Sequence, residues 1–442
     1  MKVSVGHALF ISISFLIVTG CATHRGQTIG STPMHQAQNE IPEDELLDVG
    51  ISVFETVELT EEKAKKEGTH PDVRKAERHY IPYNLKNTLQ ESSYWGAVRV
   101  IPNESDGFDV VVKGEVIESN GEWLILKIDV IDSAGNTWIR KKYKAKAKED
   151  HYTGNAPGNR DAFQDLYNTV ANEMAAYRNQ LSSAEVQEIR TISKLKFAQA
   201  FSPDAFGDYL ATDNNKGKVT IKRLPADDDP QMERILRVRE RDNMFVDTLN
   251  EYYDGFYNEM WPAYEEWRKF NLKERTAMRE IKWASYKRIA GGALLMALAI
   301  AVDASDVQGT NALQNIMIIG GGALVVDGIN VSRQQEIHAA AIQELSESIG
   351  RDMKPVVMEF EGNQYELTGS AEEQYAHWRE LLRKIYFAET GFNQFGDSQV
   401  DQTVEQEEGV QSEKPTNTFP PGEGPAHSGE GGGEGYIWMN TN

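Results

Sequence analysis

The sequence predicts an α+β protein with a small N-terminal α/β sandwich domain followed by a mostly helical domain. Three observations predict this class. Alternating apolar residues and an Asn-Gly turn dominate residues 46–155, whereas apolar residues at helical spacing dominate residues 156–350. Residues 351–395 then combine a short β-hairpin pattern with a capped helix. A glycine-rich apolar helical hairpin is predicted at 289–331, and a disordered acidic, Gly-rich tail at 396–442.

Residues 1–20 have the features of a lipoprotein signal peptide, with Lys2 near the start and an apolar run at 8–18. This run is too short for a stable membrane-spanning helix. The tetrapeptide VTGC at 18–21 resembles the lipobox of bacterial lipoproteins. The resemblance implies cleavage before Cys21 and attachment of lipid to that residue.

The residue after the predicted lipid-attachment site indicates the destination. Ala22 stands where an aspartate would favour inner-membrane retention in the enterobacterial sorting pattern, so the resemblance implies the periplasmic side of the outer membrane. Cys21 is the only cysteine, which excludes an intramolecular disulfide and a multi-cysteine metal site. Residues 21–45 are rich in Gly, Thr, Gln, His and Pro and predict a flexible tether.

The charge of the chain argues against one class of partner. The formal net charge is −22, and residues 397–442 contain nine acids and one lysine. Because nucleic-acid binding depends on cationic surfaces, we expect no nucleic-acid partner.

The first predicted domain begins with a β-α-β order. "LDVGISVFE" at 47–55 alternates like a strand, and "WGAVRVIP" at 95–102 supplies a second one. Between them, Pro82 at a first-turn position, with Leu85 and Leu89 on one face, predicts a helix over 82–91.

Three more strands follow, at 108–118, 122–132 and 136–148. Asn120-Gly121 joins the first two of these strands, and both residues tolerate the positive φ of a hairpin turn. The order is therefore β-α-β followed by a three-stranded meander.

This order, directly after a lipobox and tether, resembles the periplasmic α/β domains of three groups of lipoproteins. They are the curli-secretion lipoprotein, the exopolysaccharide-export lipoproteins and the lipoprotein activators of peptidoglycan synthases. The resemblance covers roughly residues 46–180, rests on architecture and includes no catalytic motif. It implies a role in the cell envelope.

One predicted strand carries a row of cations. Arg140, Lys142, Lys144 and Lys146 alternate on one face of the strand at 136–148. The row is interpreted either as a binding site for a phosphate-bearing glycan, a lipid head group or an acidic partner, or as a solvated edge strand that charge protects from pairing.

The helical region opens with an apolar stripe and a capping box. The stripe comprises Phe163, Tyr167, Val170, Met174 and Tyr177.

Ser182 and Glu185 then have the spacing of a capping box. Nine aromatic residues follow within 245–270, where glycan stacking is one interpretation and packing in a core or between subunits is the other. Their helical spacing favours packing.

The folded part ends with a predicted hairpin at 355–369 and a helix that begins with a capping box of Ser370 and Glu373. The buried stripe of this helix is expected to comprise Tyr375, Trp378, Leu382 and Ile385.

No motif indicates catalysis. The nine histidines show no His-Glu-x-x-His spacing, and "IIGGGALVVDG" lacks the Gly-Lys-Ser/Thr ending of a phosphate-binding loop. We therefore expect no enzyme activity, no cofactor and no metal.

The apolar stretch 289–331 has three interpretations. Its first block, 289–302, would span about 21 Å as a helix against a hydrocarbon core of roughly 30 Å, so it falls short of an ordinary membrane span. Five glycines, Gly291, Gly292, Gly320, Gly321 and Gly322, allow close helix approach. The hairpin is buried within the domain, buried between copies of an oligomer, or inserted into a membrane.

The expected function is that of an outer-membrane lipoprotein that forms an oligomeric structural or export component of an envelope machine. A lipoprotein regulator of a peptidoglycan synthase and a glycan-binding or glycan-acting protein are the alternatives. The expected partners are the outer membrane through lipidated Cys21, further copies of the chain or an envelope protein, and a glycan or lipid head group.

Overall fold

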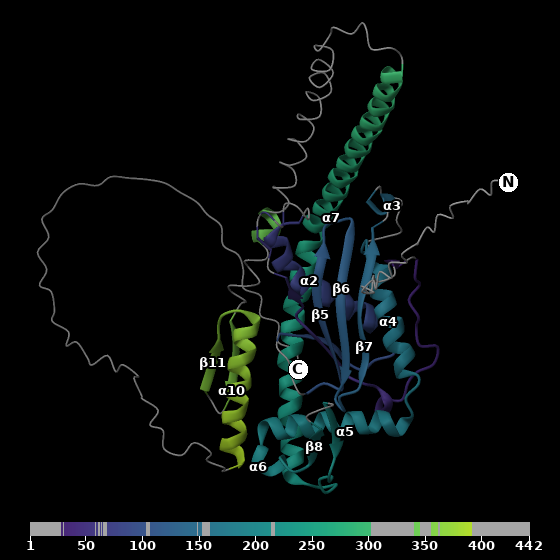
Figure 1. Ribbon diagram of the computed structural model, residues 1–442. Coiled ribbons are helices and arrows are strands. Elements are labelled where there is room, and N and C mark those ends of the chain that lie inside the picture. The colour runs from purple at the N-terminus through teal and green to yellow at the C-terminus, as the bar shows by residue number, and fades with distance from the viewer. Residues whose placement is uncertain are drawn as a thin grey trace, which may run out of the picture. The chain divides into compact units, whose positions relative to one another are not determined.

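The α+β fold class is confirmed. The computed structural model describes residues 28–29, 31–57, 59–60, 62, 64, 69–102, 107–147, 149–152, 160–213, 217–301, 340–344, 355–360 and 363–390. All of them belong to the first of the two units into which the chain divides, residues 1–392. Helices pack around a seven-stranded mixed sheet (Figure 1).

The sheet has the strand order β1-β7-β6-β5-β2-β4, and β3 pairs with β5. Its strands are β1 (Thr28–Ile29), β2 (Val49–Ser52), β3 (Glu55–Thr56), β4 (Val98–Ile101), β5 (Val110–Ser119), β6 (Trp123–Asp132) and β7 (Thr137–Lys146). β2 is parallel to both β4 and β5, and β5, β6 and β7 form an antiparallel meander. The predicted order of elements in this part of the chain is confirmed.

Among the described residues, five long helices accompany the sheet. They are α2 (Pro71–Glu91), α4 (Gln164–Arg178), α5 (Ser183–Phe201), α7 (Pro230–Ala301) and α10 (Ala371–Thr390), and η1 (Glu43–Glu45), α3 (Glu149–Tyr152) and α6 (Pro203–Phe206) are short. The capping box predicted for α5 is present, because Ser182 and Glu185 each bond the other's backbone N–H. The predicted capping box of α10 is also present.

The predicted start of α2 at Pro82 is wrong. The helix begins at Pro71, where the His70 side chain caps it, and Pro82 lies inside it. Proline in a helix interior removes a donor, which leaves the carbonyl four residues earlier without its helical partner. Here the Arg78 carbonyl accepts instead from the Phe54 backbone N–H at 3.0 Å. This contact, 24 residues away in the chain, explains why the proline is tolerated.

A second small hairpin was not predicted. β8 (Leu210–Asp213) and β9 (Lys218–Ile221) pair as antiparallel strands inside the region expected to be helical. Both strands have only four residues and are largely exposed, so they are too short for alternation to indicate a strand in sequence.

The aromatic region 245–270 forms one side of a helix interface. α7 packs against α2, where the Tyr80 ring lies 4.7 Å from the ring of Tyr257 and 4.7 Å from that of Tyr264, centroid to centroid. Tyr253 and Trp267 are also fully buried. The interpretation of these aromatic residues as a packing stripe is confirmed.

The C-terminal helix follows the predicted hairpin, β10 (Val356–Phe360) with β11 (Asn363–Leu367). The predicted stripe of α10 is buried. The helix packs on α7, where Arg379 binds Asp242 at 2.8 Å and the rings of Trp378 and Phe245 stack at 5.1 Å.

The predicted tether 21–45 is corrected in part, because residues 31–45 lie against the folded body. The Thr32 and His35 backbone N–H groups donate to Asp165 and Asn172 of α4, and the Ala37 N–H donates to the Ser92 carbonyl. These bonds join groups far apart in the sequence, so composition alone does not indicate them. β1 further attaches residues 28–29 to β7.

Several predictions lie outside the described residues. These are the signal peptide 1–20, Cys21, the glycines at 320–322 and the tail 396–442. Gly291 and Gly292 lie in the last turns of α7, and the rest of the predicted hairpin from 302 to 331 is outside. None of the helices in the described part combines the length and the apolar character needed to cross a bilayer.

Candidate functional site

Two polar clusters adjoin each other where the β5–β6 turn meets α7. Gly121 in this turn has φ +75°, and a Cβ atom there would lie 2.5 Å from the Arg268 carbonyl oxygen. Only glycine therefore allows the turn to approach the helix this closely. The predicted Asn120-Gly121 turn is confirmed, and Asn120 accepts from the backbone N–H groups of Glu122 and Trp123.

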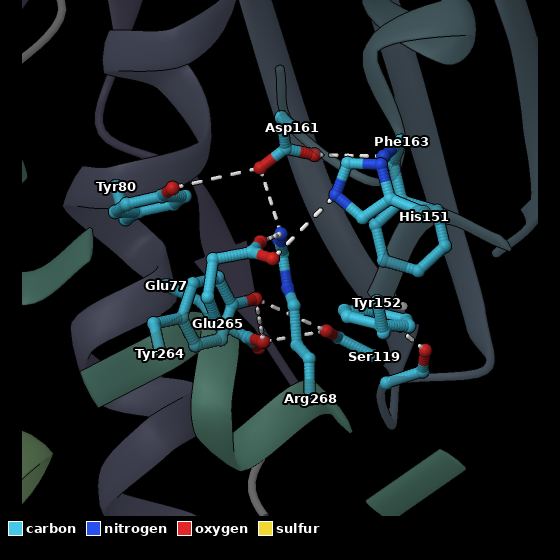
Figure 2. A network of polar contacts seen from close by, with 11 residues as sticks. Glu77, Tyr80, Ser119, His151, Tyr152, Asp161, Phe163, Tyr264, Glu265 and Arg268 are labelled. Atoms are coloured by element: carbon cyan, nitrogen blue, oxygen red, sulfur yellow. Dashed lines mark hydrogen bonds and ion pairs between the residues drawn. The ribbon is translucent and has the colours of Figure 1, made fainter. Parts of the chain in front are cut away.

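The first cluster, named here the Arg268 network, is buried. Its central Arg268 side chain is fully buried and binds Asp161 at 2.7 Å and Glu265 at 3.2 Å (Figure 2). The guanidinium carbon lies 3.8 Å from the centroid of the Tyr264 ring. Burial by itself lowers the pKa of Arg268, but Asp161 and Tyr264 raise it above its ordinary value, so the charge is retained.

A second part of the Arg268 network surrounds Glu77 of α2. The carboxylate of Glu77 accepts from the hydroxyls of Ser119 and Tyr264, both at 2.5 Å (Figure 2). Burial raises the pKa of Tyr264 well above 10, so its hydroxyl stays protonated and remains a donor. Arg74, one turn before Glu77, faces it at 3.5 Å.

The network also fixes the segment that follows the sheet. His151 of α3 lies 3.5 Å from Glu265, and the Tyr152 hydroxyl donates to the Gly121 carbonyl (Figure 2). The network therefore ties α2, β5, α3 and α7 together. Because Glu77, Ser119, Tyr264 and Arg268 are fully buried, we assign the network a structural role, which is to hold these elements together.

The second cluster, named here the Glu122 cation cluster, reaches the surface. It comprises Glu122, Trp123, Lys144, Lys146, Arg275 and Arg279. The buried Glu122 carboxylate lies 3.4 Å from Lys146 and 3.3 Å from Arg275, and it also binds Arg279. Burial pushes the pKa of Glu122 upward, but Arg279, Arg275 and Lys146 together leave it below its ordinary value.

The indole of Trp123 completes the Glu122 cation cluster. The Lys144 ammonium lies 4.1 Å from the indole centroid and that of Lys146 lies 5.6 Å from it, both within reach of cation–π attraction. Three cations thus surround the Glu122 carboxylate, and a fourth, Lys144, lies over the same indole as Lys146. The side chains of Lys146 and Arg279 remain 47% and 44% exposed, so these two cations reach solvent.

The structure divides the predicted basic row on β7. Its alternation is confirmed, because Ile139, Tyr143 and Ala145 are buried on the opposite face. Lys144 and Lys146 join the Glu122 cation cluster, whereas Arg140 pairs with Asp129 at 3.4 Å.

Lys142 is exposed and forms no ion pair with any residue in the described part of the chain. β1 pairs with β7 at Lys144 and Ala145, so this end of β7 is not a bare edge.

Hollows also occur elsewhere in the described part of the chain. A pocket of about 530 Å³ lies between α2, β4 and α7. In its lining, Arg99 binds Asp247 at 2.6 and 2.9 Å, and the Tyr83 hydroxyl donates to Asp254. A groove of about 590 Å³ separates β11 from α10. Within the described ranges, no three His, Cys, Asp or Glu side chains are placed to hold a metal ion.

The sequence interpretation missed Glu122, Trp123, Arg275 and Arg279. One signal was available, since Arg275 and Arg279 are four residues apart and share a helix face with Arg268. Their common partner is more than 150 residues away in the chain, and no local pattern indicates it.

No protein family matches this chain, and no curated protein or solved structure is significantly similar to it.

Proposed function

We propose that this protein is an outer-membrane-anchored periplasmic lipoprotein that acts as an oligomeric structural or export component of a cell-envelope machine. Its predicted parts are a lipid anchor at Cys21, an α/β domain at 46–155 and a helical domain at 156–350 that carries the apolar segment 289–331. Residues on both sides of position 155 belong to one buried core.

The single observation that carries the proposal is the course of α7. Buried side chains from Ile235 to Leu272 attach this helix to the body, and the helix then continues to Ala301 (Figure 1). Its last part, 289–301, is the uncharged, glycine-containing start of the apolar segment. A helix with such a sequence favours close packing against another helix. That helix could belong to a second copy of the chain, and the packing could take place inside a lipid bilayer.

The short link to the anchor supports the same role. Thr28, where β1 pairs with β7, lies only seven residues after Cys21 in the sequence. At about 3.5 Å per extended residue, this link spans at most about 25 Å. A lipidated Cys21 would therefore hold the body beside the membrane.

The two alternative functions receive less support. A regulator that reaches a distant peptidoglycan synthase depends on a long flexible tether, and residues 31–45 instead lie against the body. A glycan-acting protein depends on exposed aromatic rings, and Tyr253, Tyr264 and Trp267 are buried. The oligomeric component therefore remains the function that the geometry supports best.

Cysteine cross-linking in native membranes tests the proposal. Ala293→Cys places a thiol in the last turns of α7, and oxidation is expected to give a disulfide-linked dimer. Glu259→Cys, on an exposed part of the same helix inside the body, is the matched control and should stay monomeric. The unsubstituted chain serves as a background control, because lipid on Cys21 would block its only thiol.

Fractionation of the same membranes tests the anchor. The unsubstituted protein is expected in the outer-membrane fraction, and Cys21→Ser is expected to move it out of that fraction. An Ala293→Cys protein that stays monomeric, together with a strictly monomeric mass by light scattering in detergent, would contradict the oligomeric role.

A further inference from the structure

We infer that the Glu122 cation cluster is a binding site for the anionic head groups of the membrane in which Cys21 is anchored. The inference rests on the proposed function, because lipid at Cys21 is what brings the cluster to a bilayer. The proposed ligand chemistry is the phosphodiester of an anionic phospholipid.

The charges of the cluster fit this ligand. Lys146, Arg275 and Arg279 surround a single carboxylate, and Lys144 lies over the adjoining Trp123 ring, so a phosphodiester bound here would meet four cations. Guanidinium groups bind phosphate oxygens through paired N–H donors. The Trp123 indole beside them is a side chain that favours the head-group level of a membrane.

The position of the cluster relative to the anchor fits as well. Thr28 pairs with Lys144 itself, so the short link from Cys21 ends beside the cluster. The link lets Thr28 lie at most about 25 Å from the lipid-bearing Cys21. The cations beside Thr28 can therefore approach the membrane surface, and an anionic surface attracts those that come within a Debye length of about 8 Å.

The direction of α7 adds a third observation. Arg279 is followed one turn later by Trp283, which is 66% exposed, and the uncharged sequence begins at Ile289. Ile289 lies ten residues after Arg279 on this helix, a rise of about 15 Å. α7 leaves the body at the end where α3 lies, and α3 contacts α7 (Figure 1). Arg279, the exposed indole of Trp283, and then Lys287 and Arg288 in the sequence thus precede the apolar segment, and cations and tryptophan are typical of a membrane interface.

Vesicle co-sedimentation tests the site without the anchor. The mature chain, residues 21–442 with Cys21→Ser, is mixed with vesicles of phosphatidylethanolamine and phosphatidylglycerol, or of phosphatidylcholine alone. Binding is expected only to the anionic vesicles. It should be lost at about 1 M NaCl, where the Debye length falls to about 3 Å.

A matched pair of double variants locates the site. Lys144→Gln with Lys146→Gln is expected to weaken binding about tenfold or more, since each cation near an anionic surface contributes a severalfold effect. Arg140→Gln with Lys142→Gln removes the same number of charges from the same face of β7, and the nearer of the two residues, Lys142, lies two residues or about 7 Å from Lys144. This control is expected to keep most of the binding.

Other outcomes overturn the inference. Equal losses in both double variants would indicate general charge attraction, and equal binding to phosphatidylcholine would assign the contact to apolar residues. A mature chain that binds no vesicle would also overturn it. If the double variant fails to fold, Lys144→Gln alone replaces it, because Lys144 does not pair with Glu122.

The inference and the proposed function fail in different experiments. Cross-linking through Ala293→Cys and fractionation of Cys21→Ser do not depend on the Glu122 cation cluster. A dimer in native membranes, combined with no effect of the lysine substitutions on vesicle binding, would overturn only the lipid site.

Discussion

Arg268 carries a charge that water does not reach, and two carboxylates compensate it. Asp161 binds it at 2.7 Å with nearly no exposure of its own, and Glu265 binds it one turn earlier on α7. Desolvation of such a pair is costly, and removal of one partner leaves an uncompensated buried charge. Position 268 is therefore expected to be among those most sensitive to substitution.

Arg268→Leu is expected to lower the free energy of unfolding by about 3 to 5 kcal/mol, because it leaves Asp161 buried without its cation. Lys269→Leu is the matched control, since the pair of Lys269 with Glu266 is exposed, and its effect should stay below about 1 kcal/mol. Urea unfolding of both variants measures the difference. Equal effects would contradict the role given to Arg268.

The lowered pKa of Glu122 leads to a prediction about how stability depends on pH. Its pKa is lowered in the folded protein from the ordinary 4.5, so the folded state favours its charged form. The resulting stability is fully present above the unfolded-state pKa and is lost as pH falls through the lower folded-state pKa. The stability difference between the unsubstituted chain and Glu122→Gln should therefore be largest near neutral pH and shrink below 4.5.

Urea unfolding at a series of pH values measures this difference. Glu115→Gln, which breaks a partly exposed pair between Glu115 of β5 and Lys127 of β6, is the control and should change stability by less than about 1 kcal/mol. A Glu122→Gln difference that grows toward acidic pH would have the wrong sign and would refute the assignment.

At the scale of elements, the contact between the β5–β6 turn and α7 decides how the sheet meets its longest helix. Gly121 adopts φ +75° directly against the Arg268 backbone, so the turn brings Glu122 to Arg275 and Arg279. The same turn positions Trp123 beneath the lysines of β7. Both polar clusters thus depend on one hairpin turn.

Gly121→Ala is expected to destabilise the protein by more than about 1 kcal/mol, because the new Cβ would clash with backbone and positive φ disfavours alanine. Gly255→Ala is the contrasting control inside α7, where nothing lies within 4 Å of the added atom. It should stabilise the helix by about 0.5 to 1 kcal/mol. Thermal unfolding followed by circular dichroism should show opposite shifts, and shifts of the same sign would contradict this account.

At the scale of the whole described unit, the sheet and the helices share one core. Trp95 and Trp138 of the sheet region, Phe197 of α5 and Trp267 of α7 belong to the same buried cluster. The domain boundary predicted near residue 155 marks a change from strand-like to helical periodicity along the chain. The buried core is continuous across that position. Elements on both sides of that position should therefore unfold together.

Urea unfolding is expected to show one transition, with coincident midpoints for helical circular dichroism and tryptophan fluorescence. The physical reason is that loss of α7 would expose Tyr80 and the rest of the α2 face. A Tyr80→Ala variant should shift both midpoints equally. Two separated transitions, or a shift of only one midpoint, would indicate independent domains.

The sequence by itself determined the elements whose causes are local. The Asn120-Gly121 turn, the Ser182–Glu185 capping box and the alternation of β7 depend on residues within a few positions of one another. Backbone preferences and hydrogen bonds over such short distances are encoded in neighbouring residues. Patterns of this kind were therefore sufficient to predict the α+β class and most of its elements.

Only the tertiary structure decided which distant groups become partners. Three contacts join residues far apart in the chain. The Phe54 N–H donates to the Arg78 carbonyl, residues 31–45 pack on the body, and Lys146 and Arg279 both bind Glu122. Their geometry follows from how sheet and helices pack, and many residues contribute to that packing at once. The row of cations on β7 was visible in the sequence, but the division that assigns Lys144 and Lys146 to the proposed lipid site was not.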